Sequence, residues 1–309
     1  MVRNIRAVPN GTPPTTKLRA ILRQLNANLS KNVRTNLLTK LYVKACRDAN
    51  DTLKIPTALR NAADAEPTDF SRKCYLKRKI NDWVSDETGN RIEHLVEESD
   101  GIDSRVTALL LNVVHFSGEW LDRFRRTPVR NGRFYIDGKY RTSCVMMRTK
   151  DIYEYGESRR LNSQILKKRF KDKRFAMMII LPKSRTGMRK LESRLASIEL
   201  VRLATISRPV AVFIPRFEIE TKLDLIQPIK RAPHRATASV IHKVVVDINQ
   251  HGVEVPEPID REPIDPFVLQ TSVMFKADHP FVFCITAQLA GDVGSDLIVL
   301  MGKVEVPKQ

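Results

Sequence analysis

The stretch that decides the fold of this chain is residues 240–283, VIHKVVVDINQHGVEVPEPIDREPIDPFVLQTSVMFKADHPFVF. Residues 244–248 form an apolar run that is typical of a strand, and Gly252 follows shortly after it. Residues 253–274 show neither a helix period nor a strand period, and a second apolar run begins near Phe281. A loop of this length in a compact domain is usually functional. We therefore expect an exposed loop that is held by strands at both ends.

Outward from this loop, the sequence predicts a mixture of strands and helices. Apolar periodicity predicts strands at 37–43, 106–116, 133–136, 141–147, 164–170, 174–181, 210–219, 280–286 and 297–301. Helical spacing predicts helices at 17–29, 187–196 and 223–230, and two short helices within 75–96 that are separated by Gly89. Because strands and helices do not alternate in a βαβ order, the pattern indicates an α+β fold with mixed, largely antiparallel sheets.

Length and composition favour a single globular domain. We expect residues 1–16, which hold the turn-rich run VPNGTPPTT, to be a disordered lead, and residues 17–309 to form one domain. The longest apolar runs are far shorter than 18 residues, so the sequence predicts no membrane span. The first 20 residues contain basic side chains but no apolar core, so no signal peptide is predicted.

Charge suggests one class of partner and argues against another. The net charge is +18, which favours contact with a polyanion such as a sulfated glycan, although solubility alone also explains it. Aromatic residues make up only 6% of the chain, which gives little support for nucleic acid as a partner. One basic cluster lies on and after the first predicted helix, and a second forms a hairpin at 167–174. The residues of the first cluster, the candidate glycan site, are Lys17, Arg19, Arg23, Lys31 and Arg34.

Motifs of enzymes and metal sites are missing from the sequence. The four cysteines are widely spaced and form no CxxC pair, so neither zinc nor a disulfide framework is predicted, and three of them are expected to be buried thiols. The sequence contains no HExxH, GxSxG or GxxxxGK[ST], so we predict neither an enzyme nor a cofactor. His279 follows Asp278, and we interpret this pair as structural rather than catalytic.

Several segments in register identify a family. Asn112, Phe116, Gly118 and Trp120 fit the pattern N-x-x-x-F-x-G-x-W, and residues 180–182 read ILP. Further along, residues 215–217 read PRF, residues 249–254 follow an apolar strand, and residues 275–281 read FKADHPF. Together these segments resemble the serpin family of serine protease inhibitors over residues 17–307. The resemblance implies a serpin fold with several helices and an exposed reactive loop, an extracellular location and a serine protease as partner.

The resemblance also implies what the loop does. A protease cuts the loop, which then inserts into the main sheet as a strand and traps the enzyme. The implied hinge comprises Gly252, Val253, Glu254, Val255 and Pro256. Counting from both ends of the loop places the scissile bond at Leu269–Gln270 or Phe267–Val268, which suits a chymotrypsin- or elastase-like enzyme. Pro256, Glu257 and Pro258 oppose insertion, because prolines lack an N–H and a charge is costly to bury.

Two departures from the family leave alternatives open. The sequence begins after the point at which the family's first helices lie, so we expect those N-terminal helices to be missing. Residues 229–240 are also shorter than the corresponding region of the family. The chain is therefore a protease inhibitor, or a non-inhibitory relative that binds a polyanion such as a sulfated glycan, or an inactive truncated product.

Overall fold

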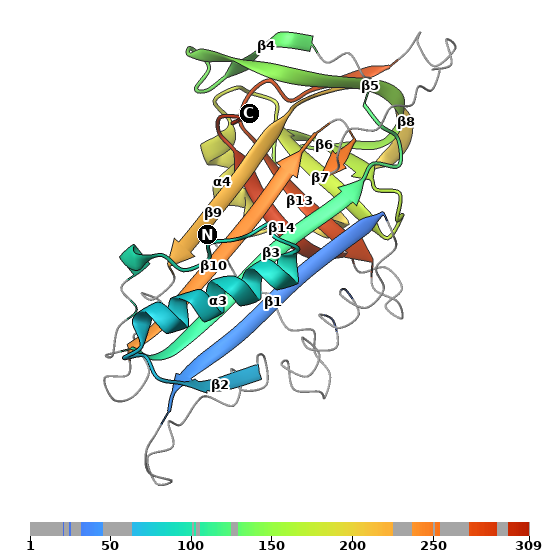
Figure 1. The fold of residues 1–309 in the computed structure, drawn as a ribbon. Helices are drawn as coiled ribbons and strands as arrows, with labels where there is room; N and C mark the ends of the chain where they lie inside the picture. The colour runs from blue at the N-terminus through green and yellow to red at the C-terminus, as the bar shows by residue number, and fades with distance from the viewer. Residues whose placement is uncertain are drawn as a thin grey trace.

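The computed structural model describes residues 21, 25, 32–45, 64–100, 102, 106–124, 129–224, 237–249, 251–253, 272–288 and 296–308. These residues form a six-stranded sheet and an eight-stranded sheet, with helices packed against them (Figure 1). Ile21 and Leu25, the described residues of the helix predicted at 17–29, are both helical, and Leu25 is buried. The described residues form one layered α+β fold, and the predicted lead, residues 1–16, lies outside them.

The six-stranded sheet carries one end of the loop. Its strand order is β2-β1-β3-β11-β10-β9. The strands span Val33–Lys44 (β1), Asp64–Thr68 (β2), Val106–Glu119 (β3), Phe217–Asp224 (β9), Thr237–Ile248 (β10) and Gly252–Val253 (β11). β1 pairs with β3 in antiparallel fashion, whereas β3 and β10 pair in parallel along most of their length. The long strands β1, β3, β10 and β9 run side by side in Figure 1.

The eight-stranded sheet carries the other end of the loop. Its main order is β12-β8-β5-β6-β7-β13-β14, and β4 pairs with β5. The strands span Val129–Tyr135 (β4), Arg141–Ser158 (β5), Ser163–Arg169 (β6), Phe175–Pro182 (β7), Ile206–Pro215 (β8), Val273–Lys276 (β12), Phe281–Gln288 (β13) and Asp296–Val304 (β14). The long strand β5 joins two regions of this sheet, because its first half pairs with β4 and its second half with β6.

Helix α3 (Lys73–Thr88) lies across one face of the six-stranded sheet (Figure 1). Leu76, Ile80 and Val84 recur at every fourth position, so they share one helix face and pack against β1, β3 and β10. Burial of each such side chain contributes about 1.5–3 kcal/mol. As predicted, Gly89 ends the helix in a left-handed conformation, with φ 61° and ψ 48°. Helix α4 (Met188–Leu195) and two 3-10 turns, η1 (Glu98–Asp100) and η2 (Leu200–Arg202), complete the described helices.

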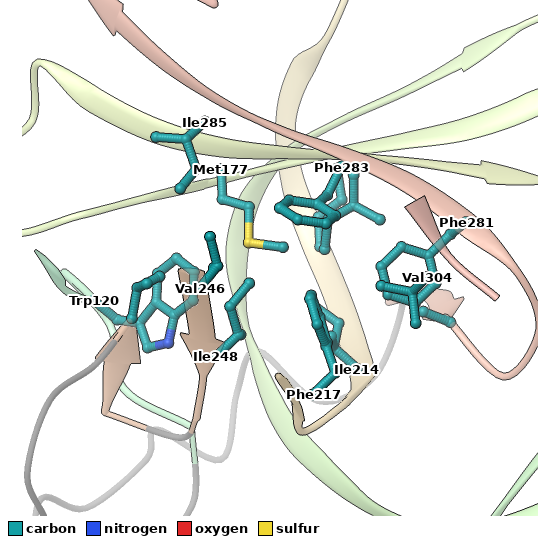
Figure 2. Close-up of a cluster of buried hydrophobic side chains, with 14 of the residues drawn as sticks. Trp120, Met177, Ile214, Phe217, Val246, Ile248, Phe281, Phe283, Ile285 and Val304 are labelled. Carbon is teal, nitrogen blue, oxygen red and sulfur yellow. The ribbon is translucent and has the colours of Figure 1, made fainter. Parts of the chain in front are cut away.

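The largest hydrophobic core lies between the two sheets. Figure 2 shows part of it, where Val246 and Ile248 of β10 face Met177 of β7 and Ile285 of β13. All 14 side chains drawn there belong to a cluster of buried hydrophobic residues, and Trp120 lies at its edge near β10. Because β10 contributes to this core and also leads into the loop, the core fixes the position at which the loop begins.

Three of the secondary-structure elements predicted from the sequence were wrong. The segment after Gly89, at 91–97, is not a second helix but an irregular, bent segment with Ile92, Leu95 and Val96 buried in the core under α3. The strand predicted at 210–219 is two strands, β8 and β9, which meet at Pro215 and Arg216. The helix predicted at 223–230 is wrong at its start, since Leu223 lies in β9, and residues 225–230 lie outside the described residues.

Candidate functional site: the base of the loop between β11 and β12

The first two residues of the loop are already a strand. β11 lies between β3 and β10: Val253 pairs with Ile248 of β10 on one side and with Gly118 of β3 on the other. Both pairings are antiparallel, so the chain turns back on itself after β10. Val253 is fully buried in the main core. The loop therefore departs from within the six-stranded sheet rather than from its edge.

A tight turn at Asn249 directs this reversal. The Asn249 side-chain oxygen accepts hydrogen bonds from the backbone N–H groups of His251, at 2.9 Å, and Gly252, at 3.2 Å. The Asn249 N–H in turn donates to the carbonyl oxygen of Gly252 at 2.9 Å. An asparagine side chain that binds the backbone two and three residues ahead is a common way to fix a turn. We refer to residues 249–253 as the loop hinge.

Trp120 anchors the loop hinge from the end of β3. Its backbone N–H donates to the carbonyl oxygen of His251 at 2.9 Å, and its indole Nε1–H donates to that of Asn249 at 3.0 Å. The ring is 1% exposed and stacks on Phe170, with 4.6 Å between ring centroids and 13° between planes. In the sequence Trp120 was only part of a motif that ends a strand. Its anchoring role requires a contact 129 residues away in the chain, which no local pattern reveals.

Away from the loop hinge, β3 and β10 pair directly with each other, and we refer to this paired stretch as the seam. They pair directly in parallel from Ala238 opposite Ala108 to Val245 opposite His115. The seam contains a polar pair, in which His242 lies opposite Asn112. Burial lowers the pKa of His242 below its usual value, although a hydrogen bond with the Asn112 backbone partly opposes this. Any strand that enters the sheet beyond β11 must separate this seam.

The segment after α3 is bound to β10 and β9, beside the seam. The Nζ of Lys243, on β10, donates to the carbonyl oxygen of His94 at 2.7 Å and pairs with Glu220 at 2.7 Å. Lys222 of β9 pairs with Asp100 at 2.6 Å. These contacts hold the segment on the sheet face that α3 also covers. Opening the seam therefore also disturbs the α3 side of the sheet.

The other end of the loop lies in the other sheet. β12 pairs in parallel with β8, and the N–H of Ala277 donates to the carbonyl oxygen of Phe213 at 2.8 Å. Both ring nitrogens of the buried His279 are engaged, one by Asp278 at 2.9 Å and the other by the Pro182 carbonyl oxygen at 2.7 Å. Burial works against the charge of Asp278, but His279 and the nearby cations outweigh it and lower the pKa. This geometry supports the structural interpretation of the pair.

The structure describes only part of the site predicted from the sequence. It places Gly252 and Val253 in β11, whereas Glu254, Val255 and Pro256 lie outside the described residues, as do both candidate scissile bonds, Leu269–Gln270 and Phe267–Val268. Of the candidate glycan cluster, Arg34 is described and is exposed on β1. Lys17, Arg19, Arg23 and Lys31 lie outside the described residues.

The basic hairpin at 167–174 is less of a charged surface than its sequence indicates. Its side chains pair largely with nearby carboxylates, and Lys168 is buried. The pairs are Lys167 with Asp296, Arg169 with Glu154, Lys171 with Glu119 and Arg174 with Asp172. Pairing neutralises much of the hairpin, so it is a weaker candidate for polyanion binding than a count of its Lys and Arg residues implies.

The described cysteines are free thiols, and the described residues that could bind a metal ion do not cluster. Cys144 and Cys284 are buried free thiols, as predicted, and burial raises their pKa values to about 11 and about 12. Cys74 is free and exposed on α3, and Cys46 lies outside the described residues. Among the described residues, His, Cys, Asp and Glu form no group that would hold a metal ion. No helix in the described ranges has the length and apolar character needed to cross a membrane.

Comparison with known proteins agrees with this architecture. Residues 7–237 match the family model described as Serpin (serine protease inhibitor). Antichymotrypsin-2 of Bombyx mori is 26% identical over 275 residues, which cover 82% of this chain and 73% of that protein. Leukocyte elastase inhibitor of Bos taurus is 28% identical over 317 residues, which cover 92% of this chain and 81% of that protein.

Solved structures show the same fold. Serpin48 of the insect Tenebrio molitor, described as a highly specific serpin, superposes with a TM-score of 0.77 at 21% identity, covering 97% of this chain and 83% of its own. Human thyroxine-binding globulin complexed with its hormone gives 0.72 at 18% identity, with coverages of 96% and 81%. Identities this low establish the fold alone. The family model, however, covers most of the sequence, and this chain therefore belongs to the serpin family, a family of protease inhibitors rather than enzymes.

Proposed function

We propose that this chain inhibits a serine protease of the chymotrypsin or elastase type, and that the protease binds and cleaves the loop between β11 and β12. The single observation that carries the proposal is the position of β11 between β3 and β10. A strand in that position is the start of the insertion that serpin inhibition requires. The names of the relatives, an antichymotrypsin and a leukocyte elastase inhibitor, support the same class of target.

The register of β11 supports a prediction of where further insertion would meet resistance. Val253 lies opposite Gly118 and Ile248. Extending both antiparallel registers by three residues brings Pro256 opposite His115 and Val245, which now pair directly with each other at the end of the seam. The residue that must part the seam first is thus a proline, which cannot donate a backbone hydrogen bond to either neighbour.

The next residue adds an electrostatic obstacle. In the same register Glu257 falls opposite Val114 and Val244, both buried in the core between the sheets. An unpaired carboxylate in such a place costs several kcal/mol. We therefore propose an inhibitor that inserts slowly, so that most encounters with a protease end in cleavage of the loop and only a minority end in a trapped complex.

The proposal includes the finer assignments from the sequence. The hinge of insertion, as distinct from the loop hinge at 249–253, comprises Gly252, Val253, Glu254, Val255 and Pro256. Cleavage occurs at Leu269–Gln270 or Phe267–Val268. Residues 17–309 act as one serpin domain behind a lead at 1–16. The protein itself is proposed to be extracellular, on the family resemblance alone.

The test is incubation with chymotrypsin or elastase, followed by denaturing electrophoresis and mass spectrometry of the fragments. We expect a minor SDS-stable complex together with cleaved chain. In the variant Pro256→Ala/Glu257→Ala/Pro258→Ala we expect the complexed fraction to rise several-fold, because the obstacles to insertion are removed. A matched control, Val255→Arg, places a charge opposite Phe116 and Val246, and it should be cleaved without forming a complex.

Cleavage at 266–270 without any complex, in both the natural chain and the triple variant, would overturn the proposal. Cleavage at another bond of the loop, with a stable complex, would overturn only the scissile assignment. Because the triple variant isolates insertion from recognition, the two failures can be distinguished.

A second candidate function is binding of a sulfated glycan without inhibition. The net charge of +18 favours it, and Arg34 is exposed on β1, next to the rest of its cluster in the chain. Elution from a heparin column should shift to lower salt in Arg34→Ala together with Lys31→Ala, relative to the control Lys171→Ala/Arg174→Ala in the paired hairpin. Equal shifts for both variants would mean that charge alone governs binding, and would sink this alternative.

A further inference from the structure

A group of exposed cations lies on helix α4 and on the turn at 159–162, between β5 and β6. Leu161 of the turn and Leu191 of α4 are buried in one hydrophobic cluster with Ile180 of β7. β7 contributes alternate residues to this cluster and to the main core, so α4 and the turn cover the face of the eight-stranded sheet that is turned away from the main core. The exposed side chains, which we call the α4 cations, are Arg159, Arg160, Lys190 and Arg194.

Hydrogen bonds to neutral groups hold two of the guanidinium groups in place. The Nη2 of Arg160 donates to the carbonyl oxygen of Ser197 at 3.1 Å and to its hydroxyl oxygen at 3.2 Å. The Nη1 of Arg194 donates to the carbonyl oxygen of Arg160 at 2.8 Å, and the Ser197 hydroxyl donates to that of Arg194 at 2.8 Å. These bonds join the turn to the end of α4. Side-chain freedom that a flexible arginine loses on binding a ligand is therefore already lost in the folded protein.

Most donors of these two guanidinium groups remain available to a ligand. Arg160 uses Nη2 and Arg194 uses Nη1, and among the described residues nothing else binds either group. A guanidinium presents its N–H groups in a rigid, planar fork, and this fork matches the oxygens of an oxyanion. Two positioned forks beside each other therefore suit a ligand that carries several oxyanions.

Other cations neutralise the carboxylates close to the α4 cations. Residues 157–163 and 187–203 contain three carboxylates, and each of them has a partner outside the α4 cations. The pairs are Glu157 with Lys183, Glu192 with Lys303 and Glu199 with Arg202. Within the part of the chain that the structure describes, no α4 cation has an ion pair with a carboxylate. Lys190 and Arg194 are also four residues apart on one helix, where like charges repel. Unlike the hairpin at 167–174, this surface is left with uncompensated positive charge.

The chemistry around the α4 cations favours one class of polyanion. Proteins that bind single-stranded nucleic acid stack its bases on exposed aromatic side chains. In the described residues the most exposed aromatic side chains are Tyr75 on α3 and Tyr140 at the turn between β4 and β5, and neither lies on α4 or on its neighbouring turn. A sulfated glycan has no bases to stack and presents sulfate groups along a flexible chain. Cations alone are sufficient to bind it.

We propose that the α4 cations bind the sulfate groups of a sulfated glycan, with Arg160 and Arg194 as the positioned forks and with Arg159 and Lys190 adding charge. The site is distinct from the candidate cluster that includes Arg34, which lies on β1 of the other sheet. The inference goes beyond protease inhibition, because it needs neither cleavage nor insertion of the loop. Either can therefore fail without the other.

The test is the dissociation constant for a heparin-derived octasaccharide, measured at several NaCl concentrations. In Lys190→Ala/Arg194→Ala we expect the Kd to rise about tenfold near physiological salt and to depend less steeply on salt, because two charged contacts are lost. The matched control Arg72→Ala/Lys73→Ala removes two exposed cations at the start of α3, which likewise have no ion pair in the described structure. It should change the Kd by less than about twofold, since charges away from the site are screened.

A second variant separates the positioned forks from charge. Arg160→Lys/Arg194→Lys keeps the net charge, but a lysine amine is a point charge without a fork. We expect binding several-fold weaker than in the natural chain. A measurement on the natural chain guards against a variant that fails to fold: the octasaccharide should protect Arg160 and Arg194 from modification by phenylglyoxal, but not the exposed Arg141 of β5.

Four outcomes would overturn the proposal. Equal weakening in the two alanine variants would mean that charge alone governs binding, and natural affinity in the double lysine variant would mean that the forks have no role. Equal modification of arginines with and without the octasaccharide would exclude contact at the site. Tighter binding of a single-stranded oligonucleotide of equal charge would assign the surface to nucleic acid. Conversely, loss of binding in Lys31→Ala/Arg34→Ala alone would place the glycan at the other cluster, and would also overturn the assignment to α4.

Discussion

At the scale of single residues, the loop hinge depends on a few polar groups placed in an apolar setting. Trp120 combines a stacked, buried ring with two hydrogen bonds to backbone carbonyl oxygens. Asn249 satisfies two backbone N–H groups through one side-chain oxygen. Neither side chain ionises, so their hydrogen bonds to the hinge do not depend on the protonation of Trp120 or Asn249.

Trp120→Phe should loosen the loop hinge while keeping an aromatic ring on Phe170. The change removes the indole donor and leaves the buried carbonyl oxygen of Asn249 without it. We expect a loss of about 2 kcal/mol in the free energy of unfolding, measured by urea titration, and faster amide exchange at 249–253. Trp83→Phe on α3 is the comparison, and equal acceleration of hinge exchange in both variants would contradict the anchoring role.

His242 should make the protein sensitive to acid. Because burial lowers its pKa in the folded state, the unfolded chain binds more protons as pH falls through 6.5, and the free energy of unfolding decreases. Stability should be unaffected by this group above pH 7 and lowest below its folded pKa. Urea titrations at pH 7.5 and 5.5 should show a smaller difference for His242→Gln than for the natural chain. His94→Gln, which alters an exposed histidine, should leave the difference unchanged.

At the scale of elements, the segment after α3 helps to hold the α3 side of the six-stranded sheet together, as the helix itself does. Asn81 of α3 accepts from the N–H groups of Leu95 and Val96, and donates to the carbonyl oxygen of Val96, at 2.9–3.0 Å. These three bonds satisfy backbone groups that a helix would pair internally, which explains how an apolar segment with helical spacing is held without forming a helix. The segment then carries the acceptor and the carboxylate that Lys243 and Lys222 bind.

Asn81→Ala should release this segment from the helix. Two buried N–H groups and one carbonyl oxygen would lose their partner, so we expect a loss of about 2–3 kcal/mol in the free energy of unfolding. Amide exchange at residues 95 and 96 should rise more than exchange within β3. A variant of matched chemistry on the exposed side, Asp82→Ala, should change neither quantity measurably. Loss of protection spread evenly over the whole sheet would instead mean that Asn81 supports global stability only.

Apolar strands were the elements that the sequence predicted best. β7 and β13 are buried almost throughout, so their runs need no alternation to be recognised. Pro215 was seen as an irregularity, but its meaning as the boundary between two sheets depends on pairing partners that are distant in the chain. β2 lacks any apolar pattern, and its place follows from pairing with β1.

At the scale of the whole molecule, cleavage and insertion are separate events. Cutting the loop of the natural chain should change the thermal midpoint little, since Pro256 meets the closed seam. In Pro256→Ala/Glu257→Ala/Pro258→Ala, cutting should raise the midpoint by roughly 10 °C or more. Each backbone hydrogen bond gained contributes about 1 kcal/mol, and each kcal/mol shifts the midpoint by about 2 °C in a large domain. Calorimetry before and after limited proteolysis measures both, and no gain in the triple variant would contradict the register.

For the site, the sequence predicted a hinge at residues 252–256; the described structure places Gly252 and Val253 in β11, and the role of the hinge stays a prediction. It did not predict that β11 is already paired on both sides, because that follows from the packing of β3 and β10. It also counted Lys168 among surface charges. Local spacing cannot distinguish a solvated lysine from one that enters an aromatic cage formed by residues 15 to 48 positions away.

The placement of the two loop ends in different sheets has a consequence for the nicked molecule. After a cut in the loop, the C-terminal piece keeps β13, which pairs with both β7 and β14 and buries Phe281 and Phe283 in the core. The two pieces should therefore copurify as a non-covalent heterodimer and separate only in denaturant. The two fragments, expressed as separate chains, should therefore associate and restore the fold.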